Sequence, residues 1–460
     1  MNNLILSVDS YKHSQYLQYP PNTTSVFSYI EARGGRFDET VFFGLQGFIK
    51  KYLTNPITIE DIDQSQSIID THMGEGLFNR SGWEYILNEH NGYLPLKIKA
   101  VPEGTVIDTK NVLVTVENTD SNCFWLTSFV ESAILRAVWY PLTVATRSRE
   151  IKKVIRDFLV TTADDSALDG IGFLLHDFGA RGVSSSESAG IGGAAHLVNF
   201  MGTDTIEGML WAMEYYNTDV PAFSVPASEH STITSWGKEN ESQAYKNMFK
   251  QFGGKYPIVS VVSDSYDIYN AVENIWGDEL KDMVISSGST LVIRPDSGEP
   301  ADVVGNIAAL LDEKYGSVVN SKGYKVLNNV KILQGDGLSE LIDFYKILDK
   351  LTRLGFSTDN VVFGMGGGLL QQVNRDTCKM AMKASYAVVD GEGRDVYKDP
   401  ITDAGKRSKR GRLALIKDDE GYKTVPEDVA GDFNELQTVY LNGKLLNETT
   451  FDEVRSRAAL

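Results

Sequence analysis

Cysteine is nearly absent from this chain of 460 residues. Cys123 and Cys378 are the only two and lie far apart, so a disulfide framework is excluded and two free thiols in a reducing compartment are expected. With these cysteines and six scattered histidines, the sequence also lacks the ligand spacing of a structural zinc site.

Long apolar runs are also missing. The most apolar stretch, AVWYPLTVA (137–145), contains a proline and is far shorter than the roughly 18 residues that a membrane span needs. The N-terminal MNNLILSVDSYKHSQY has no basic region and too short an apolar run for a signal peptide. We therefore expect a soluble, cytoplasmic protein with no membrane partner.

Basic residues are in deficit: 44 Lys and Arg face 62 Asp and Glu, a net charge of −18. Such a surface repels nucleic acid, so no nucleic-acid partner is expected, and a phosphate site needs a local basic pocket. Residues 394–412 carry seven basic and three acidic side chains. This segment is interpreted either as part of such a pocket or as a solvated basic loop.

The composition is that of a globular protein, with 42% apolar and 23% charged residues, which excludes disordered and coiled-coil classes. Residues 94–118 alternate apolar and polar side chains and predict antiparallel strands. Apolar residues every three to four positions predict a helix near 122–138.

From about residue 171 the sequence pattern changes. A short apolar run, a polar loop with glycine and a helical stretch now follow one another repeatedly. Seven such runs occur, namely GFLLHDFGARG (172–182), HLVNFMGTDT (196–205), AFSVPASEH (222–230), PIVSVVSDSYD (257–267), TLVIRPDSG (290–298), VKILQGDG (330–337) and VVFGMGGG (361–368). Continuous apolar strands alternating with helices are typical of buried parallel strands, and seven units favour a (β/α) barrel over a doubly wound sheet.

After residue 384 the sequence returns to hairpins, with turns at Asp-Glu-Gly (419–421) and at Asn442-Gly443, and a capping box at Thr450 and Glu453 opens the last helix. The predicted fold is α/β: an irregular (β/α) barrel, residues 141–383, inserted in an α+β domain built from both chain ends, residues 1–140 and 384–460.

In a (β/α) barrel the active site lies at the carboxyl ends of the strands. Six of the runs end in a group of mostly polar residues: His176, Asp177, Phe178 and Arg181; Asp204; Glu229 and His230; Asp264 and Asp267; Arg294 and Asp296; Gly335 and Asp336. Gly366, Gly367 and Gly368 follow the last run. The sequence therefore predicts a functional site on this rim.

The residue types on the rim suit a polyphosphorylated small molecule. Glycines before a helix let backbone N–H groups approach an anion, although a tight barrel turn would explain them equally well. Arg181, Arg294 and Arg375 offer bidentate phosphate contacts, and Asp296 and Asp264 could hold Mg²⁺ together with phosphate oxygens. His230 could act as a base, a phosphate contact or a phosphorylatable nucleophile.

Twelve motifs in order along nearly the whole chain resemble those of the nicotinamide phosphoribosyltransferases. They are DSYK (9–12), YPP (19–21), ETVFFGLQ (39–46), IKAVPEG (98–104), HDFGARGVSS (176–185), GTDT (202–205), SVPASEHST (224–232), VSDSYDIYN (262–270), IRPDSG (293–298), QGDG (334–337), GGGLLQ (366–371) and KRSKRGRL (406–413). The resemblance implies a type II phosphoribosyltransferase fold, a homodimer with two shared sites, and conversion of nicotinamide and 5-phosphoribosyl-1-pyrophosphate to nicotinamide mononucleotide and pyrophosphate.

The resemblance also implies roles for individual residues. Phe178 and, from the other subunit, Tyr11 would stack on the pyridine ring, and Asp204 would accept the carboxamide N–H. His230, Asp296 and Arg294 form the implied catalytic set, and ATP would phosphorylate His230 and stimulate turnover. The other implied substrate-binding residues are Arg181, Ser224, Ser260, Asp264, Gly335, Asp336, Gly366 and Gly367, with Arg375, Lys383 and Lys398 from the partner chain.

Ala180, Phe223 and Ala381 depart from the family pattern and put hydroxyl contacts around the pocket in doubt. The alternatives are a nicotinate phosphoribosyltransferase, which Asp204 opposes because two carboxylates would repel, and a catalytically silent metabolite-binding protein.

Overall fold

The computed structural model describes residues 3–402 and 407–460, which form two compact units. The first comprises the described residues of 1–146, 211–219 and 374–459, and the second comprises 147–210, 220–373 and Leu460. Residues 141–146, 211–219 and 374–383, which sequence reasoning assigned to the barrel, thus belong to the first unit. Residues 403–406 of the basic segment 394–412 lie outside the described residues.

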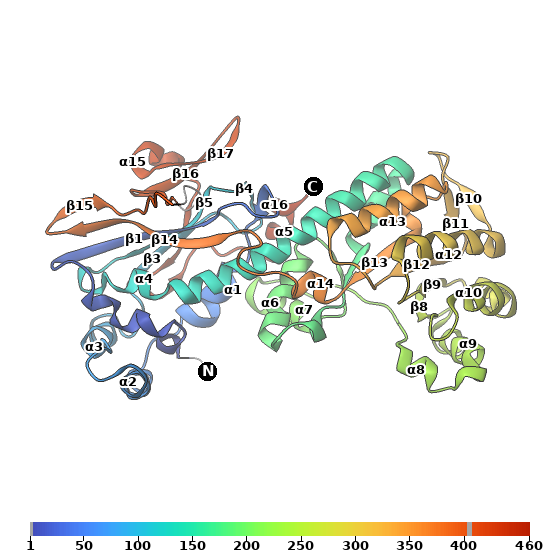
Figure 1. Cartoon of the computed structure of the whole chain (residues 1–460), viewed down its shortest axis with the longest axis horizontal. Coiled ribbons are helices and arrows are strands. Elements are labelled where there is room, and N and C mark those ends of the chain that lie inside the picture. The colour runs from blue at the N-terminus through green and yellow to red at the C-terminus, as the bar shows by residue number, and fades with distance from the viewer. Residues whose placement is uncertain (1–2, 403–406) are drawn as a thin grey trace. The chain divides into compact units, whose positions relative to one another are not determined.

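A seven-stranded antiparallel sheet forms the centre of the first unit (Figure 1). Its strands, in sheet order, are β15 (Glu392–Asp395), β14 (Met380–Val389), β1 (Thr23–Ala32), β5 (Val112–Asn118), β3 (Leu96–Ala100), β18 (Gln437–Leu441) and β19 (Lys444–Leu445). The strands predicted over 94–118 are therefore present, and β4 (Val106–Asp108) pairs separately with β2 (Glu39–Val41). The three strands from the N-terminal part of the chain lie together and are flanked on both sides by strands from the C-terminal part, so both chain ends contribute to one sheet.

The C-terminal turn signals form the elements that they predict. β16 (Leu413–Asp418) pairs with β17 (Gly421–Pro426), and Asn442 and Gly443 join β18 to β19 with φ angles of 48° and 90°. Thr450 caps α16 (Phe451–Ala458) by accepting a hydrogen bond from the backbone N–H of Glu453. The remaining α-helices of this unit are α1 (Leu45–Phe48), α2 (Ile59–Met73), α3 (Arg80–Glu89), α4 (Leu126–Phe129) and α15 (Glu427–Ala430).

The helix predicted near 122–138 is divided in two. A 3-10 turn and α4 come first, and α5 (Glu131–Thr162) then continues for 32 residues, through Pro141. A proline lacks the N–H that would bond the carbonyl one turn earlier, so it normally ends a helix. Here Gly44 packs against the proline ring, and a Cβ at this glycine would lie 2.2 Å from Pro141 Cγ. Gly44 therefore makes room for the uninterrupted α5.

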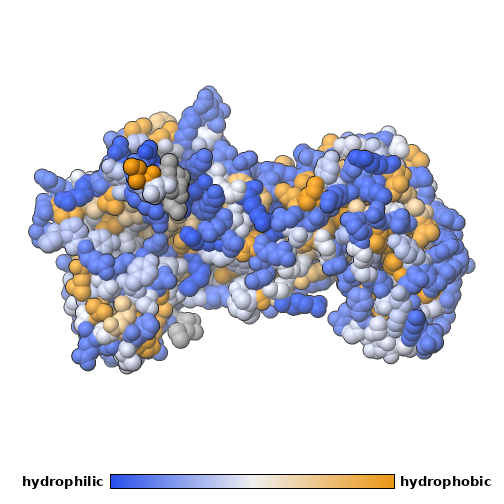
Figure 2. All heavy atoms as spheres, in the orientation of Figure 1, coloured by the Kyte–Doolittle hydropathy of each residue, from blue (hydrophilic) through white to orange (hydrophobic). Residues whose placement is uncertain are grey.

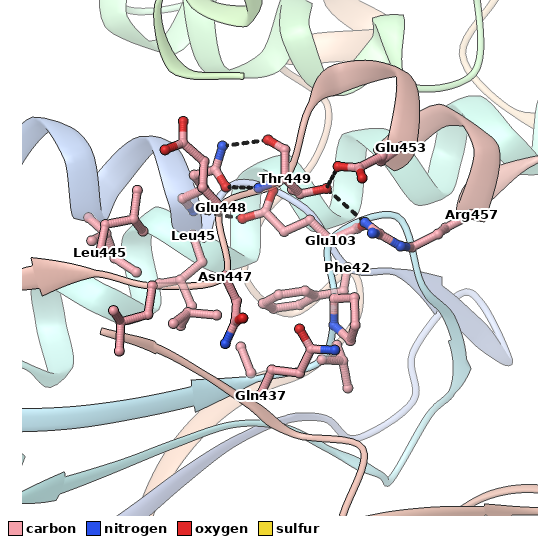
Figure 3. A pocket seen from close by; sticks show the side chains of 17 residues that line it. Phe42, Leu45, Glu103, Gln437, Leu445, Asn447, Glu448, Thr449, Glu453 and Arg457 are labelled. Carbon is pink, nitrogen blue, oxygen red and sulfur yellow. Dashed lines mark hydrogen bonds between the residues drawn. The ribbon is translucent and has the colours of Figure 1, made fainter. Parts of the chain in front are cut away.

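Glu103 is a buried carboxylate beside a pocket of about 150 Å³ in the first unit (Figure 3). It accepts hydrogen bonds from the backbone N–H groups of Gly44 and Gln46, at 3.0 and 2.6 Å, and from the Tyr216 hydroxyl at 2.7 Å. Burial raises the pKa of Glu103, although these hydrogen bonds oppose the shift. Through these hydrogen bonds Glu103 links the segment 211–219 to the start of α1. We therefore assign this buried carboxylate a structural role.

The second unit is built on a parallel sheet. In sheet order its strands are β7 (Gly202–Thr203), β6 (Leu175–Asp177), β13 (Val361–Met365), β12 (Val330–Gln334), β9 (Thr290–Arg294) and β8 (Ile258–Val262). Two parallel bridges, Gly202 to Phe223 and Ala227 to Ser260, place the segment 222–228 between the two sheet edges, β7 and β8. The seven predicted runs thus form a closed ring in chain order, which confirms the barrel.

The barrel is irregular because two of the seven runs contribute little strand. His196 and Leu197 still belong to α6, so only Gly202 and Thr203 of the second run pair as β7, and 222–228 makes isolated bridges. The α-helices that connect these strands are α6 (Ser186–Leu197), α7 (Ile206–Tyr215, of which 211–215 belong to the first unit), α8 (His230–Thr234), α9 (Glu241–Phe252), α10 (Ile268–Asn270), α11 (Lys281–Ser287), α12 (Pro300–Tyr315), α13 (Leu341–Arg353) and α14 (Gly367–Leu370). A hairpin of β10 (Ser317–Val319) and β11 (Lys325–Leu327) follows α12.

The surface in Figure 2 is mainly hydrophilic, with apolar residues in small separate groups. Within residues 3–402 and 407–460, every helix is too short or too polar to cross a membrane.

Candidate functional site

The rim of the barrel in the second unit gathers the polar residues that the sequence singles out. Two cavities of about 500 Å³ each lie there, one inside the barrel and one over the strand ends. Both are lined by Phe178, Asp204 and Arg294, which therefore lie where the two cavities adjoin. The rim cavity is otherwise lined by Ala180, Arg181, Thr205, Glu229, His230, Ser231, Asp296, Gly335 and Gly366.

The Phe178 ring owes its position to a glycine in the neighbouring strand. Its backbone N–H donates to the carbonyl of Met365, and a Cβ on Gly364 would lie 2.0 Å from the ring. Sequence reasoning missed Gly364, although an isolated glycine within a strand signals a close approach of this kind. The ring is thereby fixed over the β13 backbone, at the boundary of both cavities.

Asp204 presents an ionised carboxylate beside Phe178. Its Oδ1 accepts a hydrogen bond from Ser224 Oγ at 2.5 Å and lies 3.5 Å from His176 Nε2. Burial alone would raise the pKa of Asp204, but the contacts with His176 and Ser224 and the charge of Arg294 outweigh it and lower the pKa. Within the described residues Oδ2 accepts no hydrogen bond, and the Asp204 side chain is 48% exposed, so this oxygen can accept a hydrogen bond from a ligand.

Asp177 supports the two loops that carry Phe178 and Asp204. Its backbone carbonyl accepts from Asp204 N–H, and its buried side chain accepts from Gly179 N–H at 2.7 Å. Its second carboxylate oxygen and the Thr205 hydroxyl are buried and have no hydrogen-bond partner of good geometry among the described residues. Burial raises the pKa of Asp177 to about 6.

Replacing Asp177 with Asn should stabilise the protein at neutral pH. A buried acid with a raised pKa stabilises the fold while it is protonated, and this contribution is lost as the pH rises from about 4 to about 6. The amide keeps the acceptor for Gly179 without a charge, so the gain at pH 7.5 should be up to about 3 kcal/mol and should shrink towards pH 4. Urea unfolding of both proteins at pH 4.5 and 7.5 measures this, and a gain that does not change with pH would show that Asp177 does not titrate.

His230, Asp264 and Asp296 form a second group on the rim. His230 Nε2 lies 2.8 Å from Asp264 Oδ1, while Asp264 Oδ2 accepts from Asp296 N–H at 3.0 Å and from Ser297 Oγ at 2.7 Å. Burial would raise the pKa of Asp264, but these donors outweigh it and lower the pKa. Asp264 therefore holds the imidazole as a charged acceptor. Sequence reasoning missed Ser297, which no motif distinguishes from an ordinary loop serine.

Two arginines line the rim cavity, and they differ in how far their side chains are exposed. Arg181 is exposed, whereas the Arg294 side chain is 19% exposed and its Nη2 lies 3.7 Å from Asp296 Oδ2. Nε of Arg294 is buried without a hydrogen-bond partner in the described part of the chain. Because a buried guanidinium donor is costly to leave unpaired, Arg294 is poised to bind an anion.

The predicted glycines lie close to the Phe178 loop. Gly366 lines the rim cavity and precedes α14, a Cβ on Gly182 would lie 3.1 Å from Gly367 Cα, and Gly335 lies beside the Phe178 ring. Asp336 is exposed next to this group. Ser260 and Ser224, by contrast, line the cavity inside the barrel.

Four predicted site residues belong to the other unit, namely Tyr11, Arg375, Lys383 and Lys398. The Tyr11 side chain is 57% exposed. Burial, together with the positive charges of Arg33, Lys398 and Lys12, lowers the pKa of Lys383 although Glu131 opposes the shift. Arg33 Nε is also buried without a hydrogen-bond partner within the described residues, and its role was missed. Lys383, Lys398 and Arg33 thus form a cationic cluster whose side chains are of the kind that bind anions.

Comparison with family sequence signatures gives two matches. Residues 173–444 match the nicotinate phosphoribosyltransferase (NAPRTase) family, and residues 3–98 match the N-terminal domain of nicotinamide phosphoribosyltransferase. The first match spans the barrel, and the second spans the start of the first unit.

Two curated relatives cover essentially the whole chain, and both are named nicotinamide phosphoribosyltransferase. The protein from Xanthomonas campestris is 52% identical over 100% of this chain and 98% of its own length. The protein from Acinetobacter baylyi is 33% identical over 99% of this chain and 97% of its own length.

Solved structures share the fold at low identity. A nicotinate-nucleotide pyrophosphorylase from Pyrococcus furiosus has a TM-score of 0.62 at 15% identity, over 99% of this chain and 95% of its own. Human nicotinic acid phosphoribosyltransferase has a TM-score of 0.55 at 14% identity, over 98% of this chain and 92% of its own.

Proposed function

The chain belongs to the nicotinamide phosphoribosyltransferases, within the wider nicotinate phosphoribosyltransferase family, and we propose that it makes nicotinamide mononucleotide and pyrophosphate from nicotinamide and 5-phosphoribosyl-1-pyrophosphate. It is thus a pentosyltransferase in a salvage route to NAD. Two buried free cysteines suit the cytoplasm, where we expect the enzyme to act.

The observation that carries this proposal is the ionised Asp204 beside the Phe178 ring. Its open Oδ2 accepts an N–H of the carboxamide while the pyridine ring stacks on Phe178. Nicotinate would bring a second carboxylate to the same place, at a cost of several kcal/mol in a partly desolvated site. The structure therefore favours the amide over the acid.

The rest of the rim suits the ribosyl donor. Arg294, Arg181 and His230 lie around one cavity and can hold the pyrophosphate, while Gly335 and Gly366 allow the ribose and its 5′-phosphate to approach the backbone. We propose Asp336, Gly367 and Ser260 as further substrate contacts and Ser224 as the residue that orients Asp204.

Catalysis follows from positioning and charge. The ribose C1 becomes cation-like as the bond to pyrophosphate breaks, and Arg294 stabilises the charge on the leaving group. Nicotinamide is neutral and becomes a pyridinium as its nitrogen bonds to C1, so aromatic faces such as Phe178 gain cation–π attraction as the reaction proceeds. The ring nitrogen carries no proton to remove, so no general base is needed.

A magnesium ion fits this rim through one carboxylate. Both oxygens of Asp264 already accept protein hydrogen bonds, whereas the Asp296 carboxylate has only longer contacts, at 3.7 Å to Arg294 and 3.9 Å to His230. Mg²⁺ takes one or two carboxylates with phosphate oxygens and water. We therefore propose Asp296 as its protein ligand, with Asp264 holding His230, and the ion would neutralise charge on the leaving pyrophosphate.

His230 is proposed to accept a phosphoryl group from ATP. Asp264 binds Nε2 of the ring, which leaves Nδ1 as the nucleophile of the neutral imidazole. Nδ1 attacks the γ-phosphorus, ADP departs, and water later hydrolyses the phosphohistidine. The phosphoryl group would lie over the rim cavity, where it can improve binding of the ribosyl donor and Mg²⁺.

His230→Ala should abolish both ATP hydrolysis and acid-labile phosphate on the protein, and should weaken binding of the ribosyl donor. The neighbouring Ser231→Ala, which also changes the cavity wall, should retain both. Radiolabelled ATP measures phosphate on the protein, and product formation is followed with and without ATP. Unchanged ATPase activity in His230→Ala would contradict the role.

The enzyme is proposed to work as a homodimer with two shared sites. The exposed Tyr11 would cover the second face of the pyridine ring of the partner's site. The cationic cluster of Lys383, Lys398 and Arg33, with Arg375 near it in sequence, would approach the partner's phosphate groups. The lowered pKa of Lys383 supports an anion there, and so does Arg33 Nε, which has no hydrogen-bond partner among the described residues.

The activity is tested by incubating the protein with nicotinamide, the ribosyl donor and Mg²⁺. Nicotinamide mononucleotide and pyrophosphate should form in equal amounts, and Arg294→Ala, which removes the guanidinium expected to bind the leaving pyrophosphate, should lose most of the rate. Binding of both substrates without product would instead identify a silent metabolite-binding protein.

A further inference from the structure

Three metal-ligating side chains from two segments of the first unit converge outside the site described above. His90, Asp120 and Cys123 each offer a ligand atom, and these atoms lie within 4.8 Å of one another. His90 ends α3, and Asp120 and Cys123 belong to the turn that follows β5. We propose that this cluster binds one zinc ion, and the proposal is independent of the enzymatic activity.

The donor set suits tetrahedral zinc, and the ligand atoms would adjust their separations on binding. Zinc takes imidazole nitrogen at about 2.0–2.1 Å, carboxylate oxygen at about 2.0–2.2 Å and thiolate sulfur at about 2.3 Å, which separates ligand atoms by about 3.3–3.8 Å. His90 Nε2 and Asp120 Oδ2 are 2.9 Å apart, so an ion would replace their direct contact. Both side chains are about one-fifth exposed, at 22% and 20%, which leaves the fourth position open to water.

The surrounding hydrogen bonds orient the carboxylate. Asp120 Oδ1 accepts from Asn122 N–H at 2.8 Å, and Oδ2 accepts from the Tyr85 hydroxyl at 3.0 Å, so the ion would take the place of His90 on Oδ2 and leave these two hydrogen bonds intact. Asn118 fixes the same turn by donating to the Asp120 carbonyl and accepting from Val26 N–H of β1. Ligands of protein-bound metals are commonly held by such contacts, which limit the rearrangement on binding.

The Cys123 thiol is fully buried. A divalent cation would stabilise its thiolate and the Asp120 carboxylate together. In the binding step Zn²⁺ forms bonds to imidazole nitrogen, carboxylate oxygen and sulfur, and the thiol proton is released to solvent.

The sequence predicts no structural zinc because His90 lies 30 positions before Asp120, outside the usual ligand spacings. The fold removes that separation by bringing the end of α3 to the turn after β5. Cys378, the other cysteine, lies in the same unit next to Thr143 and provides a matched control.

Cobalt(II) tests the proposal on the intact chain after treatment with a chelator. One equivalent of Co²⁺ should produce the sulfur-to-cobalt charge-transfer absorption of a thiolate ligand, and Zn²⁺ should abolish it. Cys123→Ser should lose the band, and Cys378→Ser should keep it. Because these are the only cysteines of the chain, cobalt bound on the barrel rim cannot give this signal.

A second variant that should remain folded separates loss of the metal site from loss of structure. His90→Gln changes a partly exposed side chain, and its circular dichroism should match the wild type while its Co²⁺ affinity falls at least tenfold. Zinc should raise the thermal midpoint of the wild type and of Cys378→Ser but not of His90→Gln. A wild-type titration without the band, or a band that persists in Cys123→Ser, would overturn the proposal.

Discussion

A one-to-one mixture of Tyr11→Ala and Phe178→Ala chains is expected to recover about one quarter of the wild-type activity once the subunits have re-equilibrated. Random pairing makes half of the dimers mixed, and in each of these one of the two sites combines a wild-type Phe178 with a wild-type Tyr11. Each variant alone loses one aromatic face against the forming pyridinium, up to about 2 kcal/mol or roughly thirtyfold.

The control for this experiment is Tyr11→Ala mixed with the double variant Tyr11→Ala/Phe178→Ala, which offers no wild-type pair and should stay as slow as its parents. The rate of nicotinamide mononucleotide formation is measured before and after mixing. If the complementary mixture stays at the average of its parents, each site is built from a single chain and the shared-site proposal is wrong.

Asp204→Ser should reduce the preference for nicotinamide over nicotinate, both by lowering kcat/KM for nicotinamide and by raising it for nicotinate. The serine removes a charged acceptor for the carboxamide, worth about 1.5–3 kcal/mol, so kcat/KM for nicotinamide should fall roughly tenfold to a hundredfold. The same change removes the negative charge that repels nicotinate, so kcat/KM for nicotinate should rise. General damage to the pocket would lower both values.

Ser224→Ala is the matched control, because it removes a hydrogen bond to Asp204 Oδ1 but leaves the carboxylate. It should lower kcat/KM for nicotinamide less than Asp204→Ser does and should preserve the preference for the amide. An equal fall for both substrates in Asp204→Ser would show that Asp204 supports its loop and does not contact the amide.

The barrel could be predicted because each buried parallel strand carries its own apolar run and its own glycine-containing loop. The length of each strand was harder to predict, because strand pairing depends on residues that are distant in sequence. β7 is only Gly202 and Thr203, and the segment 222–228 closes the ring by isolated bridges. Turn chemistry is local, so Asn442-Gly443 and the Thr450 capping box could be identified from sequence alone.

Features that depend on distant packing could not be predicted in the same way. Pro141 inside α5 is accommodated by Gly44, and the Phe178 ring lies over Gly364, which is far away in sequence. Asp264 shows the same limit: the sequence indicates an acid on the rim, but only the structure shows that His230, Ser297 and Asp296 N–H occupy both its oxygens. The zinc cluster likewise exists only in the folded chain.

We propose that the rim selects nicotinamide over nicotinate as the acceptor of the phosphoribosyl group. The most direct measurement is kcat/KM of the wild-type enzyme for nicotinamide and for nicotinate, at saturating ribosyl donor and Mg²⁺. With an ionised Asp204 beside Phe178, nicotinamide should be preferred at least about tenfold. Equal values, or a preference for nicotinate, would contradict the account.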